Sequence, residues 1–219
     1  MATRMKGIFL LSLFVVMIGK NHVIGDEDTK DPVQEFKKLF HQKRIEQMAA
    51  LQQILALNPD KQNKLLGQML DQIITVLIKA KTHLDAAGFV IGQFPEDEKS
   101  RHAVALILEN TCFLSDVILR FPDFFHANLK TDREKDLIYR WGLAFSVESG
   151  LSDDNTNKML DLVSQEYGIK DKDPSFVNPY KAKKLKQKRF EDPPPKKKKE
   201  KKKMKRGPRM STELWMLKK

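Results

Sequence analysis

The sequence predicts an all-α fold: a single bundle of five or six helices around a central apolar helix at about 96–120, with a disordered basic C-terminal tail. Three observations support this prediction. Residues 96–120 are apolar over more than one stripe, which is typical of a helix that other helices surround. Apolar residues before and after this stretch recur every three or four positions. No alternating strand pattern is longer than four residues.

The first 25 residues are expected to be a secretory signal peptide. Arg4 and Lys6 precede an apolar run of 13 residues at 7–19, and the small residues Val23 and Gly25 fit the −3 and −1 positions of a cleavage site. An apolar helix of this length rises only about 20 Å, less than the ~30 Å hydrocarbon core of a membrane. A permanent anchor is therefore disfavoured, and the rest of the chain is expected to be soluble in the secretory pathway.

Two helices are expected between residues 31 and 88. Asp31-Pro32 is an N-cap pattern, Asn58-Pro59 ends the first helix and starts the second, and Gly88 follows the second. Each helix carries an apolar stripe, and the two are interpreted as a packed helical hairpin. The stripes comprise Val33, Phe36, Leu39, Phe40, Ile45, Met48, Leu51, Ile54 and Leu55, then Leu65, Leu66, Met69, Leu70, Ile73, Ile74, Leu77, Ile78 and Leu84.

The central helix is expected between Pro95 and Pro122. A proline is tolerated in the first turn of a helix and stops one at its end, and residues 96–98 place carboxylates at the positive end of the helix dipole. Residues 122–129 are expected to form a small turn. The only cysteine, Cys112, lies on the apolar helix, so no intramolecular disulfide forms and the thiol is interpreted as part of the core.

Two further helices are expected before residue 169. Residues 131–134 read Thr-Asp-Arg-Glu, a capping box, and Gly150 closes the helix that starts there. Ser152 or Asp153 caps the last helix, which Gly168 closes. The inner face of the first of these helices is expected to comprise Leu137, Ile138, Trp141, Ala144 and Phe145.

The net charge of +11 is concentrated at one end of the chain. Residues 181–219 hold 18 Lys and Arg against 4 acidic residues, whereas residues 1–180 hold 22 against 25. The prolines and the cationic runs after residue 169 leave too little apolar surface to offset the entropy of ordering. We therefore expect a signal peptide at 1–25, a helical domain at 26–169 and a disordered Lys-rich tail at 170–219.

The basic block of the tail has more than one interpretation. It is either a solvated tail or a segment that binds an anionic surface, such as lipid head groups, acidic chaperone segments or ribosomal RNA. Nucleic acid is disfavoured because no aromatic residues lie between the lysines to stack on bases. A nuclear role requires that the signal peptide be bypassed. The candidate residues are Lys196, Lys197, Lys198, Lys199, Lys201, Lys202, Lys203, Lys205 and Arg206.

No catalytic, cofactor-binding or metal-binding residues are predicted. The five histidines are scattered, and the sequence has no Cys-x-x-Cys or His-x-x-x-His spacing, phosphate-binding loop or nucleophile elbow. We therefore expect a protein without enzymatic activity and without a small-molecule substrate. Arg140 and Trp141 are the candidate partner-binding residues of the helical domain. They are either a core pair or an exposed anchor, because Trp and Arg are enriched at interface hot spots.

Several short motifs, in order and at matching spacing, resemble the family of coiled-coil domain-containing protein 134. The similarity runs from Phe36-Lys37-Lys38 to Gly207-Pro208-Arg209 and includes Phe94-Pro95-Glu96-Asp97-Glu98-Lys99, Glu109-Asn110-Thr111, Asp116-Val117-Ile118-Leu119-Arg120-Phe121-Pro122 and Arg140-Trp141-Gly142. The resemblance implies a non-enzymatic helical adapter in the endoplasmic reticulum lumen. Its implied partners are the nascent lumenal Hsp90 chaperone, the oligosaccharyltransferase and the translocon. The implied role of the adapter there is to prevent hyperglycosylation. It also implies, as the alternative, a secreted, cytokine-like regulator of kinase signalling and cell proliferation.

The sequence departs from this family at two places. The family ends in a KDEL-like tetrapeptide that closes in Ser-Glu-Leu, whereas Ser211, Thr212, Glu213 and Leu214 are followed here by Trp215-Met216-Leu217-Lys218-Lys219. A retention receptor reads a free carboxylate at the C-terminus, so this retention-like motif is expected not to work. The family's glycosylation site is also absent at residues 147–149. We expect the protein in the endoplasmic reticulum lumen, in the medium, or in both.

Overall fold

The structure, a computed structural model, describes residues 31–181. These residues form six helices and no strand, which confirms the all-α prediction. The expected signal peptide at 1–25, the basic block at 196–206 and the retention-like motif at 211–214 lie outside the described residues. The helices are α2 (Pro32–Leu55), α3 (Pro59–Ala86), α4 (Glu98–Arg120), α5 (Pro122–Asn128), α6 (Arg133–Glu148) and α7 (Asp154–Tyr167).

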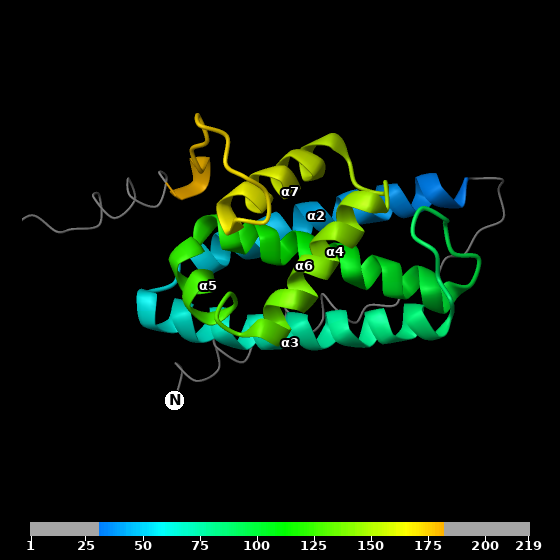
Figure 1. Ribbon diagram of the computed structural model, residues 1–219, viewed down its shortest axis with the longest axis horizontal. Coiled ribbons are helices and arrows are strands. Elements are labelled where there is room, and N and C mark those ends of the chain that lie inside the picture. Colours follow the sequence, from blue (N-terminus) through cyan, green and yellow to red (C-terminus); the bar gives the residue numbers. More distant parts are fainter. Residues whose placement is uncertain (1–30, 182–219) are drawn as a thin grey trace, which may run out of the picture.

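Helix α4 is the centre of the bundle, as predicted. It contacts each of the other five described helices (Figure 1), and every residue from Asn110 to Pro122 is buried. Among residues 31–181, α4 alone is long and apolar enough to cross a membrane, but 78% of its most apolar window is buried inside the bundle. This burial is what the core helix of a folded domain requires.

Side-chain caps fix where the helices begin. Asp31, Asn58, Asp97, Asp132 and Asp153 each accept a hydrogen bond from a backbone N–H in the first turn of the helix that follows. These bonds satisfy donors that the helix itself leaves unpaired. Asp97 caps α4, so this helix starts at Glu98, slightly later than the predicted 96.

The predicted capping box at 131–134 is wrong by one residue. Asp132 is the cap of α6 and accepts from the N–H of Lys135 at 3.2 Å. The Thr131 hydroxyl instead donates to the Ala127 carbonyl at 2.8 Å, in the turn that follows α5. A carboxylate next to the expected cap therefore takes its place, since Asp caps a helix at least as well as Thr.

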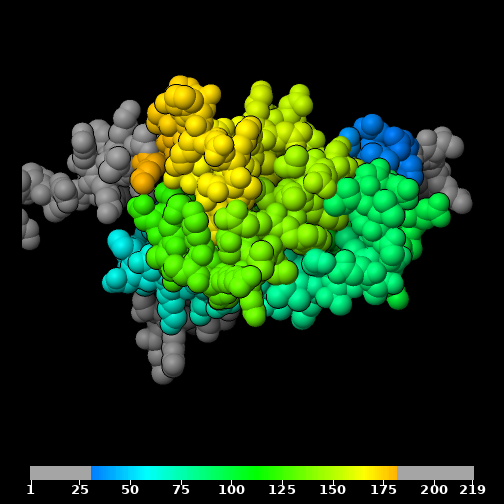
Figure 2. Space-filling model, in the orientation of Figure 1, coloured from blue at the N-terminus to red at the C-terminus, as the bar shows by residue number. Residues whose placement is uncertain are grey.

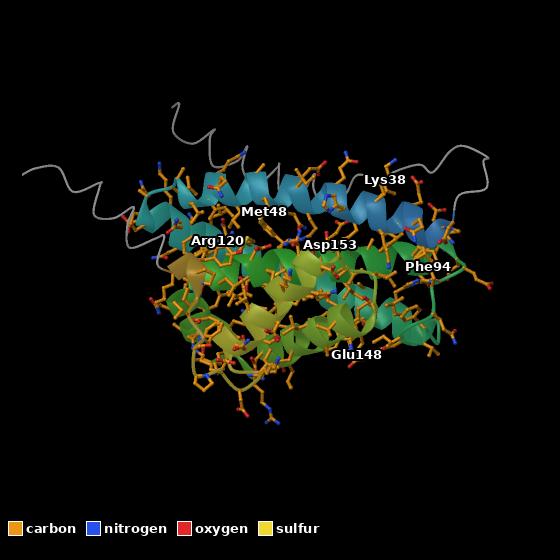
Figure 3. The ribbon with its side chains drawn as sticks, turned by 90° about the horizontal axis from the view of Figure 1, so that it is seen from above. Lys38, Met48, Phe94, Arg120, Glu148 and Asp153 are labelled. Atoms are coloured by element: carbon orange, nitrogen blue, oxygen red, sulfur yellow. The ribbon has the colours of Figure 1, made fainter. Side chains whose placement is uncertain are left out.

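The predicted hairpin of α2 and α3 is not a packed pair, because α4 lies between the two helices (Figure 1). Seen from above, α2 with Lys38 and Met48 lies along one side of the bundle and Glu148, at the end of α6, lies on the other (Figure 3). Because α4 is apolar on most sides, it can pack against the apolar stripe of α2 and that of α3 at the same time. Polar contacts also hold α2 to α4: Arg44 pairs with Asp116.

The folded body continues past the boundary expected at residue 169. Residues 169–181 lie against the ends of α4 and α5. Asn178 Nδ2 donates to the Leu119 carbonyl at 2.8 Å, and the Arg120 guanidinium lies 4.2 Å from the centre of the Tyr180 ring. The last carbonyls of a helix lack partners within it, so Asn178 supplies one for α4. The segment has few apolar residues, so its sequence does not predict this contact.

Candidate functional site

The core face of α6 is only partly the one predicted: Phe145 is buried and Ile138 and Trp141 pack against the core as expected. Its buried residues are Tyr139, Gly142, Leu143, Phe145 and Ser146. Leu137 is 56% exposed and Ala144 is exposed, so both were wrongly assigned to the inner face.

The reason for this orientation is Gly142. A Cβ there would lie 2.6 Å from Thr111 Oγ1 of α4 and 3.6 Å from Leu77 Cδ1 of α3. Because α6 approaches α3 and α4 at the glycine, the side of α6 opposite Gly142, which includes Leu137, faces outward.

Arg140, one of the two predicted site residues in this domain, is engaged inside the protein. Its Nε donates to Asp136 Oδ2 at 2.8 Å, and its guanidinium lies 5.5 Å from the centre of the Tyr167 ring. The Tyr167 hydroxyl donates to the other Asp136 oxygen at 2.7 Å. Burial and the nearby Asp136 carboxylate raise the pKa of Tyr167. Arg140 therefore links α6 to α7.

Trp141, the other predicted residue, lies between the core and the surface. Its ring centre is 5.5 Å from that of Phe145, which is 6.0 Å from that of Phe89. Lys81 Nζ of α3 lies 5.1 Å from the centre of the Trp141 ring and pairs with Asp85 at 2.6 Å. Trp141 is therefore half-buried, with an ammonium group close to its ring.

Most exposed apolar side chains lie on α3, the loop after it and α6, and α3 and α6 meet at Lys81 and Trp141. We define the α6 surface as Trp141 together with Ile78 (45% exposed), Val90 (57%), Ile91 (39%), Leu137 (56%) and Val147 (55%). These five are the majority of the eight large apolar residues that are exposed in residues 31–181. They come from α3, the loop after it and α6, and α6 lies on the near face of the molecule in front of α4 (Figures 1 and 2).

Acidic residues border the α6 surface at both ends. Glu134 and Glu148 lie seven positions before and after Trp141, and Asp71 and Asp85 lie seven positions before and after Ile78. Seven positions are about two turns, so the acids share a helix face with the apolar centre. Asp71 and Asp85 pair with lysines, whereas Glu134 and Glu148 form no ion pair with any described residue.

The sequence predicts Trp141 as a candidate, places Leu137 and Ile78 in the core, and gives no role to Val147, whereas Leu137, Ile78 and Val147 are all exposed. The signal was present in α6, whose sequence carries apolar residues on more positions than a single inner face holds. Which of them face the core depends on where α6 meets α4, and the glycine that decides this has no hydrophobic signature. In α3, Ile78 was part of the predicted core stripe but is exposed at its edge.

The described residues offer little for covalent or metal chemistry. Between residues 31 and 181 no three His, Cys, Asp or Glu side chains lie close enough together to hold a metal ion. Burial raises the pKa of the Cys112 thiol to about 12, which keeps it protonated at neutral pH. The feature that stands out is the α6 surface, and exposed apolar patches rimmed by polar residues mark sites of protein association.

Fold and surface together define an all-α protein whose candidate site is an apolar docking face. Comparison with known proteins shows the family. Residues 22–211 match a family model described as "ERK and JNK pathways, inhibitor". The chain is 37% identical to coiled-coil domain-containing protein 134 of Mus musculus over 179 residues, which is 80% of this chain and 78% of the relative.

The protein of the same name from Xenopus tropicalis is 40% identical over 149 residues, which is 67% of this chain and 65% of the relative. No solved structure matches the chain. The chain belongs to the family of coiled-coil domain-containing protein 134, as its motifs indicated.

Proposed function

We propose that this protein is a non-enzymatic, protein-binding adapter in the lumen of the endoplasmic reticulum, and that the α6 surface is a docking face. The observation that carries the proposal is that Leu137 and Ile78, both exposed, lie one helical turn from Trp141 and from the Lys81 that contacts it. The signal-like sequence at 1–25 supports the lumenal compartment. The family resemblance supplies the partners: the nascent lumenal Hsp90 chaperone and the oligosaccharyltransferase at the translocon, with prevention of hyperglycosylation as the outcome.

Affinity capture after crosslinking in intact microsomes tests this proposal. Leu137→Glu places a charge in the centre of the α6 surface, and Ile45→Glu on α2 is the matched control because Ile45 is 61% exposed. Substitutions at exposed positions change folding stability by only about 0.5 kcal/mol, so both variants should fold. We expect the parent and Ile45→Glu to recover both partners.

We expect Leu137→Glu to recover about tenfold less of both, because burying a Leu side chain contributes roughly 1.5–3 kcal/mol and 1.4 kcal/mol is a factor of ten. Recovery of neither partner by the parent chain contradicts the adapter role. Equal recovery by both variants contradicts the assignment of the docking face.

A second function is favoured by a different observation, the description of the family model that matches residues 22–211. On this proposal the protein is secreted and regulates ERK and JNK signalling from outside the cell. Trp215-Met216-Leu217-Lys218-Lys219 after the retention-like motif agree with secretion.

Comparing medium with lysate, for this chain and for one truncated after Leu214, separates the two functions. Secretion of the parent with retention of the truncated chain supports the second. Purified protein added to cells should then lower the phosphorylation of ERK and JNK, and unchanged phosphorylation contradicts it.

A further inference from the structure

One segment of the sequence has no binding role in either proposed function. Residues 210–217 hold five large apolar side chains, whereas Met204 is the only one between residues 191 and 209. The apolar residues of this 210–217 segment are Met210, Leu214, Trp215, Met216 and Leu217. Basic residues border the segment on both sides, with Arg209 before it and Lys218 and Lys219 after it.

The α6 surface has the complementary arrangement. Its apolar centre is Ile78, Leu137 and Trp141, and acids border it at both ends of both helices. Glu134 and Glu148 have no cation paired with them among the described residues. Asp71 and Asp85 are already paired with Lys135 and Lys81, so Glu134 and Glu148 are the acids that a basic–apolar–basic segment can match. Potentials that match in this way favour association and set the register of the partners.

We propose that the 210–217 segment docks on the α6 surface of its own chain. Its apolar side chains would cover Leu137 and Trp141, while the basic residues on either side would lie near Glu134 and Glu148. Glu213, the one acid of the segment, would lie near the central Lys81. This inference does not depend on the proposed function, because the occupant belongs to the same molecule.

The chain between the folded body and the segment is long enough. Lys181, the last described residue, pairs with Asp123 of α5 at 3.2 Å. Residues 182–209 are 28 residues, for which a flexible chain has a root-mean-square span of about 30 Å. A folded body of residues 31–181 has a radius of gyration of about 15 Å, and 28 residues extend to at most roughly 90–100 Å, so the α6 surface is within reach.

A modest intrinsic affinity is sufficient for this contact. A short tether gives the segment an effective concentration of the order of 1 mM at the surface. With a dissociation constant of about 1 mM, the segment is then docked in half of the molecules. The docked segment would compete with any partner for the α6 surface. An external partner would then have to displace it, which reduces that partner's apparent affinity.

A spin label tests the contact directly. Lys219→Cys in the full chain adds one accessible thiol, since the native Cys112 is fully buried. With the label attached, we expect the amide signals of residues 134–148 and 75–85 to lose intensity. Amides in the middle of α2, on the other side of α4, should keep theirs. Leu137→Glu should weaken docking about tenfold, which lowers the docked fraction from about one half to about one tenth, and Ile45→Glu should leave that fraction unchanged.

Four outcomes would overturn the proposal. The first is equal loss of signal from α2 and α6, which would indicate unspecific attraction of a basic chain. The second is an unchanged effect when Trp215 and Leu217 are both replaced by Ser with the charges intact. The third is an effect that appears only between a spin-labelled chain and a separate isotope-labelled chain, because the occupant would then be a second copy. Absence of any signal loss also contradicts it.

Discussion

Replacing Gly142 by Ala is the most direct test of how α6 meets α4. The new Cβ would lie 2.6 Å from Thr111 Oγ1, a distance that Cβ atoms do not tolerate. Thr111 is fully buried in the middle of α4, so its branched side chain has no free space to move into. Gly67 of α3 is the matched control, because nothing lies within 4 Å of a Cβ added there.

Two terms decide the sign of each change. Replacing Gly by Ala inside a helix stabilises it by about 1 kcal/mol. Overpacking a well-filled interior costs about 1–3 kcal/mol. Gly67→Ala carries only the first term and should stabilise the protein by up to ~1 kcal/mol. Gly142→Ala carries both terms. Its free energy of unfolding should be about 1–3 kcal/mol lower than that of Gly67→Ala, and about 1 kcal/mol lower than that of the parent.

Urea unfolding at constant m-value measures these differences, and 1 kcal/mol corresponds to about 2–4 °C in Tm for a domain of this size. A double-mutant cycle with Thr111→Ala identifies the clash, since Gly142→Ala should become stabilising once the Thr side chain is removed. Stabilisation by Gly142→Ala in the parent chain would refute the close approach of α6 to α4. An unchanged cost in the Thr111→Ala background would refute Thr111 as the obstacle.

Three further predictions concern buried groups. Asp116→Ala leaves two arginines buried without their shared carboxylate and should cost about 3–5 kcal/mol in urea unfolding, whereas Asp123→Ala, at a carboxylate 89% exposed, should cost under ~1 kcal/mol. Burial raises the pKa of Glu109 from 4.5 to about 7, so the folded state holds a proton that the unfolded chain releases. The free energy of unfolding should therefore fall as the pH rises from 4.5 through 7. Glu109→Gln should remove this fall and be about 1–3 kcal/mol more stable than the parent at pH 8. Cys112, with a pKa of about 12, should react with a thiol reagent only at the rate of unfolding, and fast labelling in native buffer would contradict its burial.

The starts and ends of most helices were predictable from the sequence because they depend on local chemistry. The central position of α4 was predictable as well. Caps such as Asp31 and Asp153 and the glycine at 168, with a φ of 77°, act within one turn of their own helix. The central position of α4 followed from composition, since a helix apolar on most sides has to be surrounded. These features need no knowledge of which helix lies next to which.

The pairing of helices was not predictable in this way. Two amphipathic helices joined by Asn58-Pro59 read as a hairpin, yet both bury their stripes against α4. Likewise the orientation of α6 depends on Gly142, whose role appears only when Thr111 and Leu77 are placed beside it. The position of Leu137 on the surface, and with it most of the candidate site, therefore required the tertiary structure.

Site-specific photocrosslinking measures most directly whether the α6 surface binds proteins. A photoreactive residue placed at Leu137 should give crosslinks in living cells, either to the proposed lumenal partners or to the chain's own 210–217 segment. The same residue at Ile45, which is equally exposed on α2, should give few. Crosslinks at Ile45 that equal or exceed those at Leu137 would contradict the account.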